Sequence, residues 1–360
     1  MSRQDGRQPS RASEMHPLET HGTLEMPTIK LTNKPDVTFN CADGDTVLRA
    51  ALRAGLGFPY ECNVGSCGNC LFEIAEGTVE HERKDAPGWN ERHKSRNRWL
   101  GCQARPKGDL AIKVNLRDHY APRFKPARTS ARVESITDVT HDIREFRLKP
   151  AAATRFLPGQ YALLYVPGVE GARAYSMANI TDDGAIWDFQ IKKVPGGAAT
   201  ERLFSGVEAG EEIAIDGPFG MAYLREDAPR DILCLAGGSG LSPMVSIARG
   251  FAACGALQGQ QLHFVYGGRQ VRDIAGEQFL TELAGFGSRI HYYPVLSMPE
   301  GENWSGRTGF IHDAALALFG DKLKEMEIYF AGPPAMANAV VKMMHEAKVP
   351  QAQVHYDQFY

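Results

Sequence analysis

Apolar and polar positions follow three successive patterns along this chain, and the first pattern covers residues 28–120. TIKLTNK and VTFNC alternate as strands do, and DTVLRAALRAGL repeats its apolar residues at helical spacing. Asp45 stands where the N-cap of that helix is expected. LFEIAEG and DLAIKVN predict two more strands, so the segment is expected to form a small α+β unit. The apolar helix face comprises Val47, Leu48, Ala51 and Leu52.

The second and third patterns follow a short linker, APRFKPA, at residues 121–127. Residues 128–225 contain short alternating strands separated by Gly and Pro, which is typical of an antiparallel β-barrel. From residue 226 to residue 360, apolar strands such as RDILCLAGG and QLHFVYGG alternate with helical stretches such as LSPMVSIARGFAAC. This alternation predicts an open, mostly parallel α/β sheet. Residues 1–27 are polar and are expected to form a disordered extension.

Composition adds several exclusions to this three-part organisation. No apolar run approaches the ~18 residues that a membrane span requires. The formal net charge of −3 gives no reason to expect a nucleic-acid binder. The first 26 residues lack the apolar core of a signal peptide, so we expect a cytoplasmic monomer. In that compartment cysteines serve more often as metal ligands or buried residues than as disulfides.

The cysteines of YECNVGSCGNC are the most informative chemical signal in the sequence. Cys62, Cys67 and Cys70 are followed by Cys102, which gives the C-x4-C-x2-C…C spacing of plant-type [2Fe–2S] proteins. Small residues and glycines between the cysteines allow backbone N–H groups to approach the sulfurs. A zinc site is the alternative, but four-cysteine zinc sites usually show two C-x2-C pairs. The other cysteines, Cys41, Cys234 and Cys254, are expected to be packing residues.

FPYECNVGSCGNC followed by LGCQ resembles the ferredoxin domain of the reductases that serve bacterial multicomponent oxygenases. The similarity to reductases of toluene monooxygenases and ring-hydroxylating dioxygenases extends over residues 28–360. The resemblance implies three domains in a fixed order. These are a β-grasp [2Fe–2S] ferredoxin domain at 28–120, an antiparallel β-barrel for FAD at 128–225 and a parallel α/β domain for NAD at 226–360.

RAYSMAN, within the predicted barrel, is the first candidate flavin motif. Alternation places Arg173 and Tyr175 on one face of a strand and Ser176 on the other. The resemblance implies that Arg173 binds the pyrophosphate and that Tyr175 and Ser176 contact the isoalloxazine. PGQY and the Gly-rich helix start VPGGAATERL complete the site, and a dedicated pyrophosphate loop favours FAD over FMN. The candidate flavin-binding residues are Pro158, Gly159, Gln160, Tyr161, Arg173, Ala174, Tyr175, Ser176, Ile191, Lys192, Val194, Gly196, Gly197, Ala199 and Thr200.

LAGGSGLSP, VYGGR and YFAGPPAM form the candidate nucleotide site, because glycines at a strand end let a pyrophosphate approach a helix start. No acidic residue ends VYGGR, and Asp273 comes only four residues after Arg269. The resemblance favours NADH, with NADPH as the alternative. Many relatives have a cysteine where Ala331 stands. The candidate nucleotide-binding residues are Gly237, Gly238, Ser239, Gly240, Pro243, Tyr266, Gly267, Arg269, Gly332 and Pro333.

The chain ends in HYDQFY, which supplies two further candidates. The resemblance implies that Phe359 stacks on the exposed flavin face beside Tyr360, whereas the simpler alternative is ordinary terminal packing. Ser176 and Phe359 are therefore the two candidate catalytic residues, with Ser176 offering a hydrogen bond to flavin N5.

Taken together, the three sites predict an electron-transfer enzyme. NADH gives two electrons as a hydride and an iron–sulfur cluster accepts one at a time, so a flavin must stand between them. The expected acceptor is a ferredoxin, of Rieske type, or the oxygenase of an aromatic-hydrocarbon oxygenase system. Alternatives are a reductase serving a deoxysugar dehydratase or a methane-type monooxygenase, and a non-enzymatic electron carrier. The basic run at residues 83–98 is either a solvated face or a docking patch for a transient acidic partner.

Overall fold

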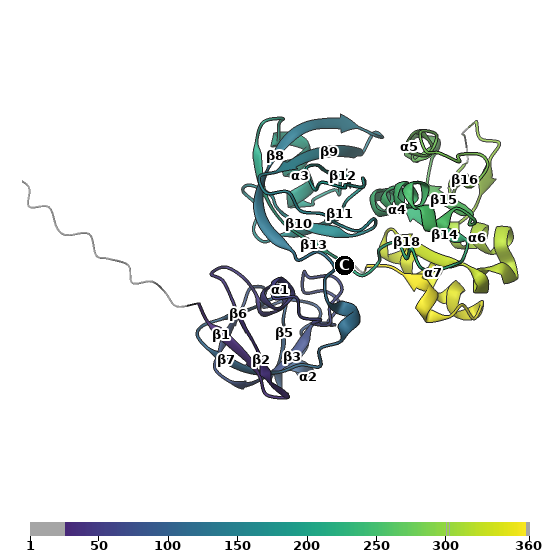
Figure 1. Cartoon of the computed structure of the whole chain (residues 1–360). Helices are drawn as coiled ribbons and strands as arrows, with labels where there is room; N and C mark the ends of the chain where they lie inside the picture. The colour runs from purple at the N-terminus through teal and green to yellow at the C-terminus, as the bar shows by residue number, and fades with distance from the viewer. Residues whose placement is uncertain (1–25, 300, 302, 358–360) are drawn as a thin grey trace, which may run out of the picture.

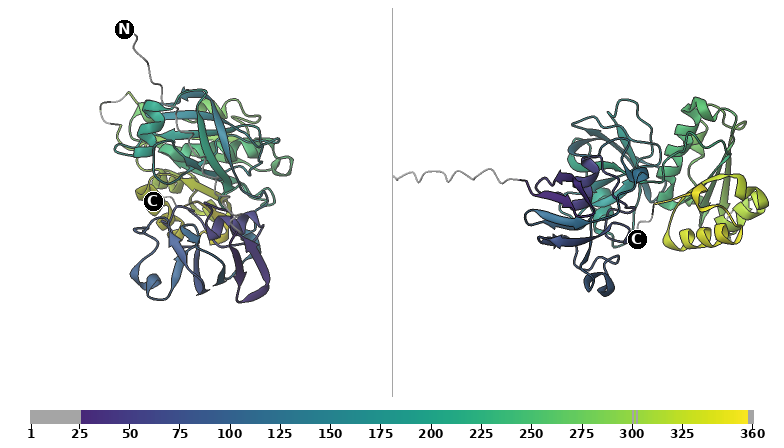
Figure 2. Two further views of the ribbon diagram at one scale, coloured as in Figure 1. Left: turned by 90° about the vertical axis from the view of Figure 1, so that its left-hand side faces the viewer. Right: turned by 60° about the horizontal axis from the view of Figure 1, so that its bottom comes forward.

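The computed structural model describes residues 26–299, 301 and 303–357, and it contains three sheets that follow one another along the chain (Figure 1). The predicted extension therefore lies outside the described residues, apart from its last two. Within the described part of the chain, no helix has the length and apolarity needed to cross a bilayer. Figure 2 shows that the first two sheets lie on one side of the molecule and the third on the other.

The first sheet has five strands in the order β2-β1-β7-β3-β5. β1 and β7 run parallel, and the other neighbouring strands run antiparallel. Helix α1 buries its predicted apolar face against this sheet, which gives the expected β-grasp arrangement. The elements are β1 (Thr28–Leu31), β2 (Lys34–Asn40), α1 (Val47–Arg53), β3 (Leu71–Glu76), β4 (Val79–His81), α2 (Glu91–Lys94), β5 (Arg98–Leu100), β6 (Ala104–Pro106), β7 (Leu110–Lys113) and η1 (Asp118–Tyr120).

The predicted cap of α1 is wrong by one residue. Thr46, not Asp45, is the N-cap, and its hydroxyl accepts the backbone N–H of Arg49 at 3.5 Å. Asp45 instead accepts the N–H of Thr46 and forms an ion pair with Arg53, with 2.7 Å between Nε and Oδ2. Both residue types favour the cap position. The difference arises because the Arg53 guanidinium, one helix length away, binds the aspartate carboxylate.

The second sheet is the predicted antiparallel barrel, with strand order β11-β10-β13-β8-β9-β12. Its ends are joined beyond β11, where the N–H of Ala178 donates to the carbonyl of Asp188 in β12 at 2.6 Å. The side chain of Asn179 accepts the N–H of Asp188 at 2.9 Å. The elements are β8 (Ala127–Asp138), β9 (Ile143–Pro150), β10 (Tyr161–Tyr165), β11 (Arg173–Ser176), β12 (Trp187–Lys192), α3 (Ala198–Gly206) and β13 (Glu212–Phe219).

The third sheet is wholly parallel, in the order β17-β16-β15-β14-β18-β19. Alternate residues of β14 face α4 on one side and α6 with α7 on the other, so the strand is buried on both faces. The elements are β14 (Ile232–Gly237), η2 (Gly238–Gly240), α4 (Leu241–Ala253), η3 (Gly255–Leu257), β15 (Leu262–Gly268), η4 (Val271–Asp273), α5 (Glu277–Leu280), β16 (Ile290–Leu296), β17 (Arg307–Thr308), α6 (Ile311–Phe319), η5 (Gly320–Glu325), β18 (Glu327–Ala331), α7 (Pro334–Glu346), η6 (Gln351–Gln353) and β19 (Val354–His355).

The first two sheets share one hydrophobic core. Tyr161, Leu163 and Phe219 of the barrel belong to the same buried cluster as the residues beneath α1. The rings of Tyr60 and Phe219 meet edge to face, with 6.4 Å between centroids. Arg53 reaches across the boundary to Asp216, with 2.7 Å between Nη2 and Oδ2. The barrel is therefore packed directly against the cysteine-bearing unit.

Candidate functional site

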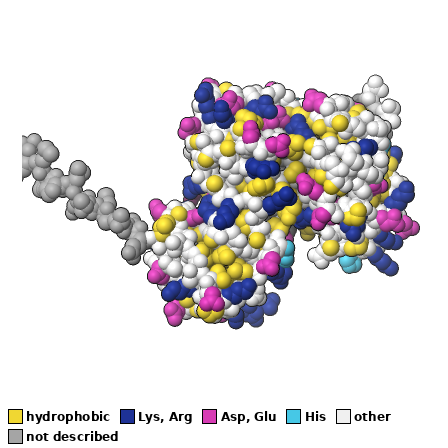
Figure 3. All heavy atoms as spheres, in the orientation of Figure 1, with side chains coloured by type: hydrophobic (Ala, Val, Ile, Leu, Met, Phe, Trp, Pro, Cys, Tyr) yellow, Lys and Arg dark blue, Asp and Glu magenta, His cyan; other side chains and the backbone are white. Residues whose placement is uncertain are grey.

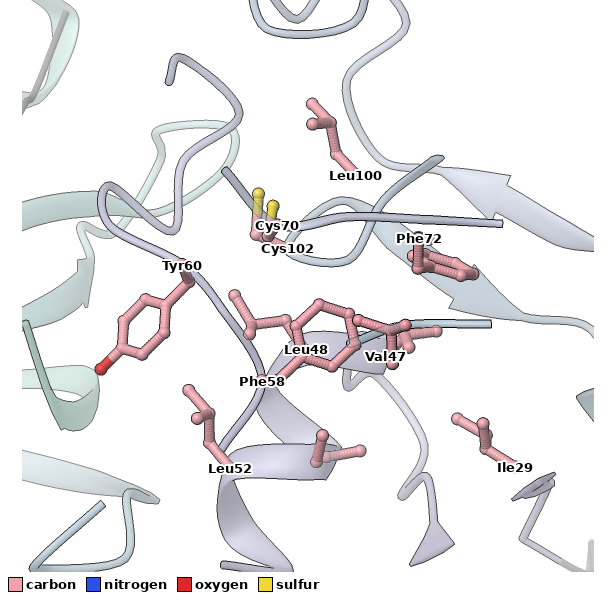
Figure 4. Close-up of a cluster of buried hydrophobic side chains, with 14 of the residues drawn as sticks. Ile29, Val47, Leu48, Leu52, Phe58, Tyr60, Cys70, Phe72, Leu100 and Cys102 are labelled. Atoms are coloured by element: carbon pink, nitrogen blue, oxygen red, sulfur yellow. The ribbon is translucent and has the colours of Figure 1, made fainter. Parts of the chain in front are cut away.

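The four predicted ligand cysteines lie in one loop region of the first domain as two pairs. The Cys62 and Cys67 thiols are within hydrogen-bonding reach of each other, as are those of Cys70 and Cys102. Figure 4 shows the Cys70 and Cys102 sulfurs side by side above the buried cluster that includes Leu48 and Phe58. Three of the four are buried and Cys67 is half-buried. Two adjoining pairs are the arrangement that two bridged irons require, because each iron takes two thiolates.

Backbone groups are already directed at the sulfurs. The N–H groups of Ser66 and Cys67 each donate to Cys62 Sγ at 3.4 Å. The thiol of Cys67 and these N–H groups together lower the pKa of Cys62 to about 6, although burial opposes them. Gly65 and Gly68 have φ of 85° and 80°, which lets the loop turn its N–H groups inward. The loop therefore favours thiolate, the form that ligates a metal.

A single zinc ion fits this loop less well than a two-iron cluster. Four sulfurs around one zinc ion, each about 2.3 Å away, would all lie within roughly 4 Å of one another. Among the described residues, the set of three metal-ligating side chains that gathers within 4.8 Å is His141, Asp142 and Asp273, and it contains no cysteine. The cysteine pairs are thus spread over a group larger than one ion.

The other cysteines pack as predicted. Cys234 lies in the middle of β14, where burial raises its pKa. Burial likewise raises the pKa of Cys41, and Cys254 ends α4.

The two barrel motifs predicted to bind flavin are neighbours in space. β10 pairs with β11 antiparallel, which sets Tyr161 opposite Ser176 and Ala162 opposite Tyr175. Tyr175 is half-buried, and burial raises its pKa to about 12, so its phenol stays neutral. Arg173 is exposed on the edge strand, where its guanidinium donates to the carbonyls of Glu170 and Ala172. The strand therefore offers a cation and an aromatic ring, as the sequence predicts.

Helix α3 begins beside this strand with no capping side chain. Gly197 is its N-cap, so the first N–H groups of the helix are open to an anion. Thr200, by contrast, uses its hydroxyl locally, accepting the N–H of Val194 at 3.1 Å and donating to backbone carbonyls. The adjoining Gly196 N–H donates to the carboxylate of Glu201. The remaining predicted members are Ala199, buried in the helix, and Ile191, buried in β12.

Two residues of PGQY hold loops together. The Gln160 amide oxygen accepts the N–H of Leu157 at 2.8 Å, and its nitrogen donates to the Gly220 carbonyl at 3.2 Å. The Tyr161 hydroxyl donates to the carbonyl of Glu61, the residue that precedes Cys62. Pro158 and Gly159 pack against α4, since the N–H of Gly159 donates to Ser246 Oγ at 3.1 Å. This motif therefore connects the barrel to both other domains.

The predicted nucleotide-binding loops meet at the point where strand order reverses, between β14 and β18. Ala236 pairs with Ala331, and the glycines that follow β14 lie against those that follow β18. A Cβ at Gly240 would lie 1.8 Å from the Ala331 carbonyl oxygen, so only glycine fits there. Pro243 stands in the first turn of α4, which has no side-chain cap. A crevice at such a reversal is where ligands of parallel sheets bind.

Residues at the end of β15 line the same edge. The Tyr266 hydroxyl donates to the Gly238 carbonyl at 3.5 Å. The carboxylate of Asp273 returns to the strand end, where it accepts the N–H groups of Arg269 and Gln270 at 3.1 and 3.0 Å. This acidic residue is thus used to hold the loop that carries the exposed Arg269.

Lys192, predicted as a flavin residue, lies between the barrel and the nucleotide loops. Its ammonium forms an ion pair with Asp142, and its side chain passes the Gly238 backbone, where a Cβ would lie 3.2 Å from Cδ. The ion pair and a hydrogen bond from Thr140 lower the pKa of Asp142, although burial opposes them. Lys192 therefore contacts the predicted flavin and nucleotide regions at once.

The polar face of α4 was not predicted from the sequence. Ser242 Oγ donates to the Ser176 carbonyl at 2.7 Å, and Ser246 Oγ donates to the Asn179 carbonyl at 2.8 Å. Arg249 donates to the Ala178 carbonyl at 2.9 Å. These three residues are spaced four and three apart, which places them on one helix face. That spacing is the signal that could have identified them as the contact between the third domain and the flavin strand.

The last described residues lie where all three domains meet. Asp357 accepts the N–H of Met221, next to Gly220, whose N–H donates to the Tyr60 hydroxyl at 3.0 Å. Tyr356 stacks on Phe330 of β18, with 4.4 Å between ring centroids. The predicted Phe359 and Tyr360 lie outside the described residues.

Three domain families match the chain in the same order as the sheets. The 2Fe-2S iron-sulfur cluster binding domain matches residues 31–107, the oxidoreductase FAD-binding domain residues 130–223 and the oxidoreductase NAD-binding domain residues 234–342. A ferredoxin–NAD(P)+ reductase of Metapseudomonas resinovorans is 38% identical over 324 residues, covering 89% of this chain and 96% of the relative. The chain belongs to this reductase family. The reductase is therefore an oxidoreductase with 2Fe–2S, FAD and NAD as its cofactors, as the sequence predicts.

Two further comparisons support the same conclusion. The naphthalene 1,2-dioxygenase system reductase component of Pseudomonas putida is 32% identical over 321 residues, covering 88% of this chain and 94% of the relative. The solved ferredoxin reductase in carbazole 1,9a-dioxygenase superposes with a TM-score of 0.85 at 34% identity, covering 93% of this chain and 98% of that one. The expected fold, three domains of β-grasp, barrel and parallel α/β type, is confirmed for the reductase.

Proposed function

We propose that this reductase passes electrons from NADH through FAD and a [2Fe–2S] cluster to a ferredoxin of Rieske type or directly to an oxygenase. One observation carries the proposal. Tyr161 pairs in register with Ser176 of the flavin strand, and its hydroxyl donates to the carbonyl of Glu61, next to Cys62. The candidate flavin and cluster sites are thus one residue apart through hydrogen-bonded contacts. Such closeness suits electron transfer between them.

The cofactors would be held by the residues predicted from the sequence. Cys62 and Cys67 would ligate one iron, and Cys70 and Cys102 the other. Arg173 and the start of α3 would hold the FAD pyrophosphate, and Tyr175 would pack on the isoalloxazine. When bound, FAD accepts electrons in pairs and releases them singly.

The chain itself orients and shields these groups. Ser242 fixes the Ser176 carbonyl, so the flavin strand and the nucleotide crevice keep one relative position. Tyr60 and Tyr161 are both almost fully buried between the cluster loop and the barrel, where they exclude water. The Ser176 hydroxyl is available as a hydrogen-bond partner for the flavin. The chemistry requires no nucleophile or general base from the protein.

The acceptor is proposed from the relatives. The names of several of them place those proteins in naphthalene dioxygenase and phenol monooxygenase systems. We propose the same kind of role for this chain, as a cytoplasmic monomer that meets its acceptor transiently, with domain boundaries at 28–120, 128–225 and 226–360. Transient redox partners bury little surface and rely on charge for encounter.

The experiment that tests the proposal separates flavin-dependent from cluster-dependent activity. Ferricyanide accepts electrons from the flavin, whereas cytochrome c serves as the probe for transfer through the cluster. In Cys67→Ser, NADH–ferricyanide activity should persist while NADH–cytochrome c activity falls to background. Cys254→Ser, outside the cysteine array, is the matched control and should retain both activities. Loss of ferricyanide activity in a folded, FAD-loaded Cys67→Ser protein would contradict the proposed order of electron transfer.

A further inference from the structure

We propose that the acceptor docks on a basic surface beside the cluster loop and presents carboxylates to it. This surface, called here the exit surface, comprises Trp89, Arg92, Lys94, Arg96, Arg98 and Trp99. The inference rests on the proposed function, because it names where the electron leaves and what kind of partner receives it. The run was recognisable in the sequence as basic, but its place relative to the cysteines comes from the structure.

The exit surface is joined directly to the cluster loop. The N–H of Gly88 donates to the Gly65 carbonyl at 3.0 Å. A Cβ at Gly88 would lie 2.7 Å from the backbone nitrogen of Gly68, so the two backbones are in contact. Trp89, the next residue, therefore lies one residue away from the loop that carries Cys62 and Cys67.

Aromatic stacking makes the base of this surface rigid. His81 stacks on Trp89 with 4.1 Å between ring centroids, and Trp89 meets Trp99 at 4.9 Å. The Trp89 indole N–H donates to the Arg98 carbonyl at 2.7 Å, and the Trp99 indole N–H donates to the Asn97 side chain at 2.9 Å. Both tryptophans are half-buried. Fixed rings hold the neighbouring arginines in a defined place without a large loss of side-chain entropy on docking.

The charges on the exit surface are largely uncompensated. Lys94 is paired with Glu91 at 2.7 Å and lies over the Trp89 ring. Arg92, Arg96 and Arg98 are exposed, and none forms an ion pair with a carboxylate in the described part of the chain. Figure 3 shows Lys and Arg side chains gathered at the end of the first domain where Figure 1 labels α2.

The field of these three arginines is felt by a neighbour. Burial and then the charges of Arg98, Arg92 and Arg96 lower the pKa of His93, which lies among them on α2. An acidic partner would relieve this concentration of positive charge and would be steered toward it. Because the opposite side of the cluster loop is covered by the barrel through Tyr60 and Tyr161, the exit surface is an open approach to the cysteines.

The test uses two probe proteins of opposite charge, the acidic soluble domain of cytochrome b5 and the basic cytochrome c. The triple variant Arg92→Glu, Arg96→Glu, Arg98→Glu should slow NADH-dependent reduction of cytochrome b5 by about tenfold at low ionic strength. The difference should shrink at high ionic strength, where exposed charges are screened. Reduction of cytochrome c should become faster in the same variant, and ferricyanide activity should stay unchanged.

A matched control removes the effect of net charge alone. Lys322, Lys342 and Lys348 are exposed on the third domain, and reversing these three gives the same total charge as the arginine variant. Their reversal should change neither probe beyond a small, equal amount. Equal effects of the two triple variants, or a salt-independent loss, would overturn the docking inference. The exit would then lie elsewhere, for example at the hollow of about 330 Å3 lined by Asn69, Leu71 and Tyr120.

Failure of the proposed function would look different. In that case the wild-type protein would reduce neither cytochrome with NADH, although it could still reduce ferricyanide through its flavin. The charge-reversal comparison would then have no starting activity, and the electron path through the cluster would be rejected. Wild-type reduction of both probes with no dependence on the sign of the probe's charge rejects only the docking surface.

Discussion

Gly88 shows how a single residue without a side chain can decide whether the cluster loop keeps its form. It lies far from the cysteine motif in the sequence of contacts that a reader would list, yet its Cα touches the backbone of Gly68 and its N–H bonds to Gly65. The two loop glycines adopt positive φ, and Gly88 supplies the space beside them. The three glycines therefore form one close backbone contact.

Gly88→Ala should weaken the cluster site. Its Cβ would lie 2.7 Å from the nitrogen of Gly68, so either the loop or residues 86–89 must shift, at a cost of about 1–3 kcal/mol. The measurements are iron content per chain and the thermal unfolding midpoint. Gly108→Ala is the matched control in the same domain, because nothing lies within 4 Å of a Cβ there. Equal iron content and stability in both variants would show that the contact does not matter.

Sequence reasoning reached the single residues that act through local spacing and missed those that act across the fold. The cysteine array and its glycines follow from spacing, and the structure brings the four thiols together as expected. Gly88 was not identified, because its partner is distant in the chain and adjacent only in space. The cap of α1 was assigned to Asp45 rather than Thr46, because the sequence does not reveal that Arg53 binds the aspartate.

Helix α1 does more than cover its own sheet, since it also fastens the first domain to the barrel. Arg53 at its end contacts Asp45, the Pro126 carbonyl and Asp216 in β13. The Asp216 side chain is only 1% exposed, whereas that of Arg53 is 24% exposed. The carboxylate is therefore buried and depends on this arginine for its compensation.

Arg53→Met should destabilise the junction strongly, by about 3–5 kcal/mol, because it leaves the Asp216 carboxylate buried without a partner. Adding Asp216→Asn should recover part of the loss, since the uncompensated charge is then removed. Denaturant unfolding measures both variants. Arg83→Met breaks an exposed ion pair with Asp85 and should cost no more than about 1 kcal/mol. A loss at Arg53 as small as that at Arg83 would mean that the junction does not rely on the pair.

Long, strongly patterned elements were predicted well from the sequence, and short ones were not. The barrel strands and the parallel strands β14, β15, β16 and β18 lie where alternation and apolar runs place them. The short pair β4 and β6, the two-residue strands β17 and β19, and helix α2 carry too few residues for a period to be visible. The serine face of α4 lies within a correctly predicted helix, but its partners belong to another domain.

The three domains converge on the loop that follows β13, and Asp357 is the third domain's contribution. The Tyr60 hydroxyl accepts the Gly220 N–H from one side, and the Asp357 carboxylate accepts the Met221 N–H at 3.3 Å from the other. Burial, reinforced by the charge of Glu61, raises the pKa of Asp357 to about 7, although the backbone N–H groups oppose the rise. The junction therefore contains a carboxyl group that folding makes harder to ionise.

This raised pKa gives the junction a pH dependence with a definite sign. Between about pH 4 and pH 7 the folded protein holds a proton on Asp357 that the unfolded chain has lost, so stability falls as the pH rises through this window. Asp357→Asn should remove that fall. Its thermal unfolding midpoint should exceed that of the wild type at pH 8 and approach it near pH 4. Asp321→Asn, at a 99% exposed side chain, should show no such crossover.

The pH experiment also has a clear negative outcome. An Asp357→Asn protein that is less stable than the wild type at pH 8 would show that the carboxylate stabilises the junction in its charged form. The order of the domains could be predicted from the sequence, whereas this junction could not, because it is assembled from residues 60, 220–222 and 357, which no local pattern connects.

The measurement to make before any other is an anaerobic visible spectrum of the purified protein, taken before and after titration with NADH and then NADPH. The predicted result is a spectrum with flavin bands and a broad cluster shoulder, both bleached by NADH at lower concentration than by NADPH. The four paired thiols and the adjoining flavin strand require both signals. A colourless protein, or flavin without cluster absorbance after reconstitution with iron and sulfide, would contradict electron transfer through a [2Fe–2S] centre.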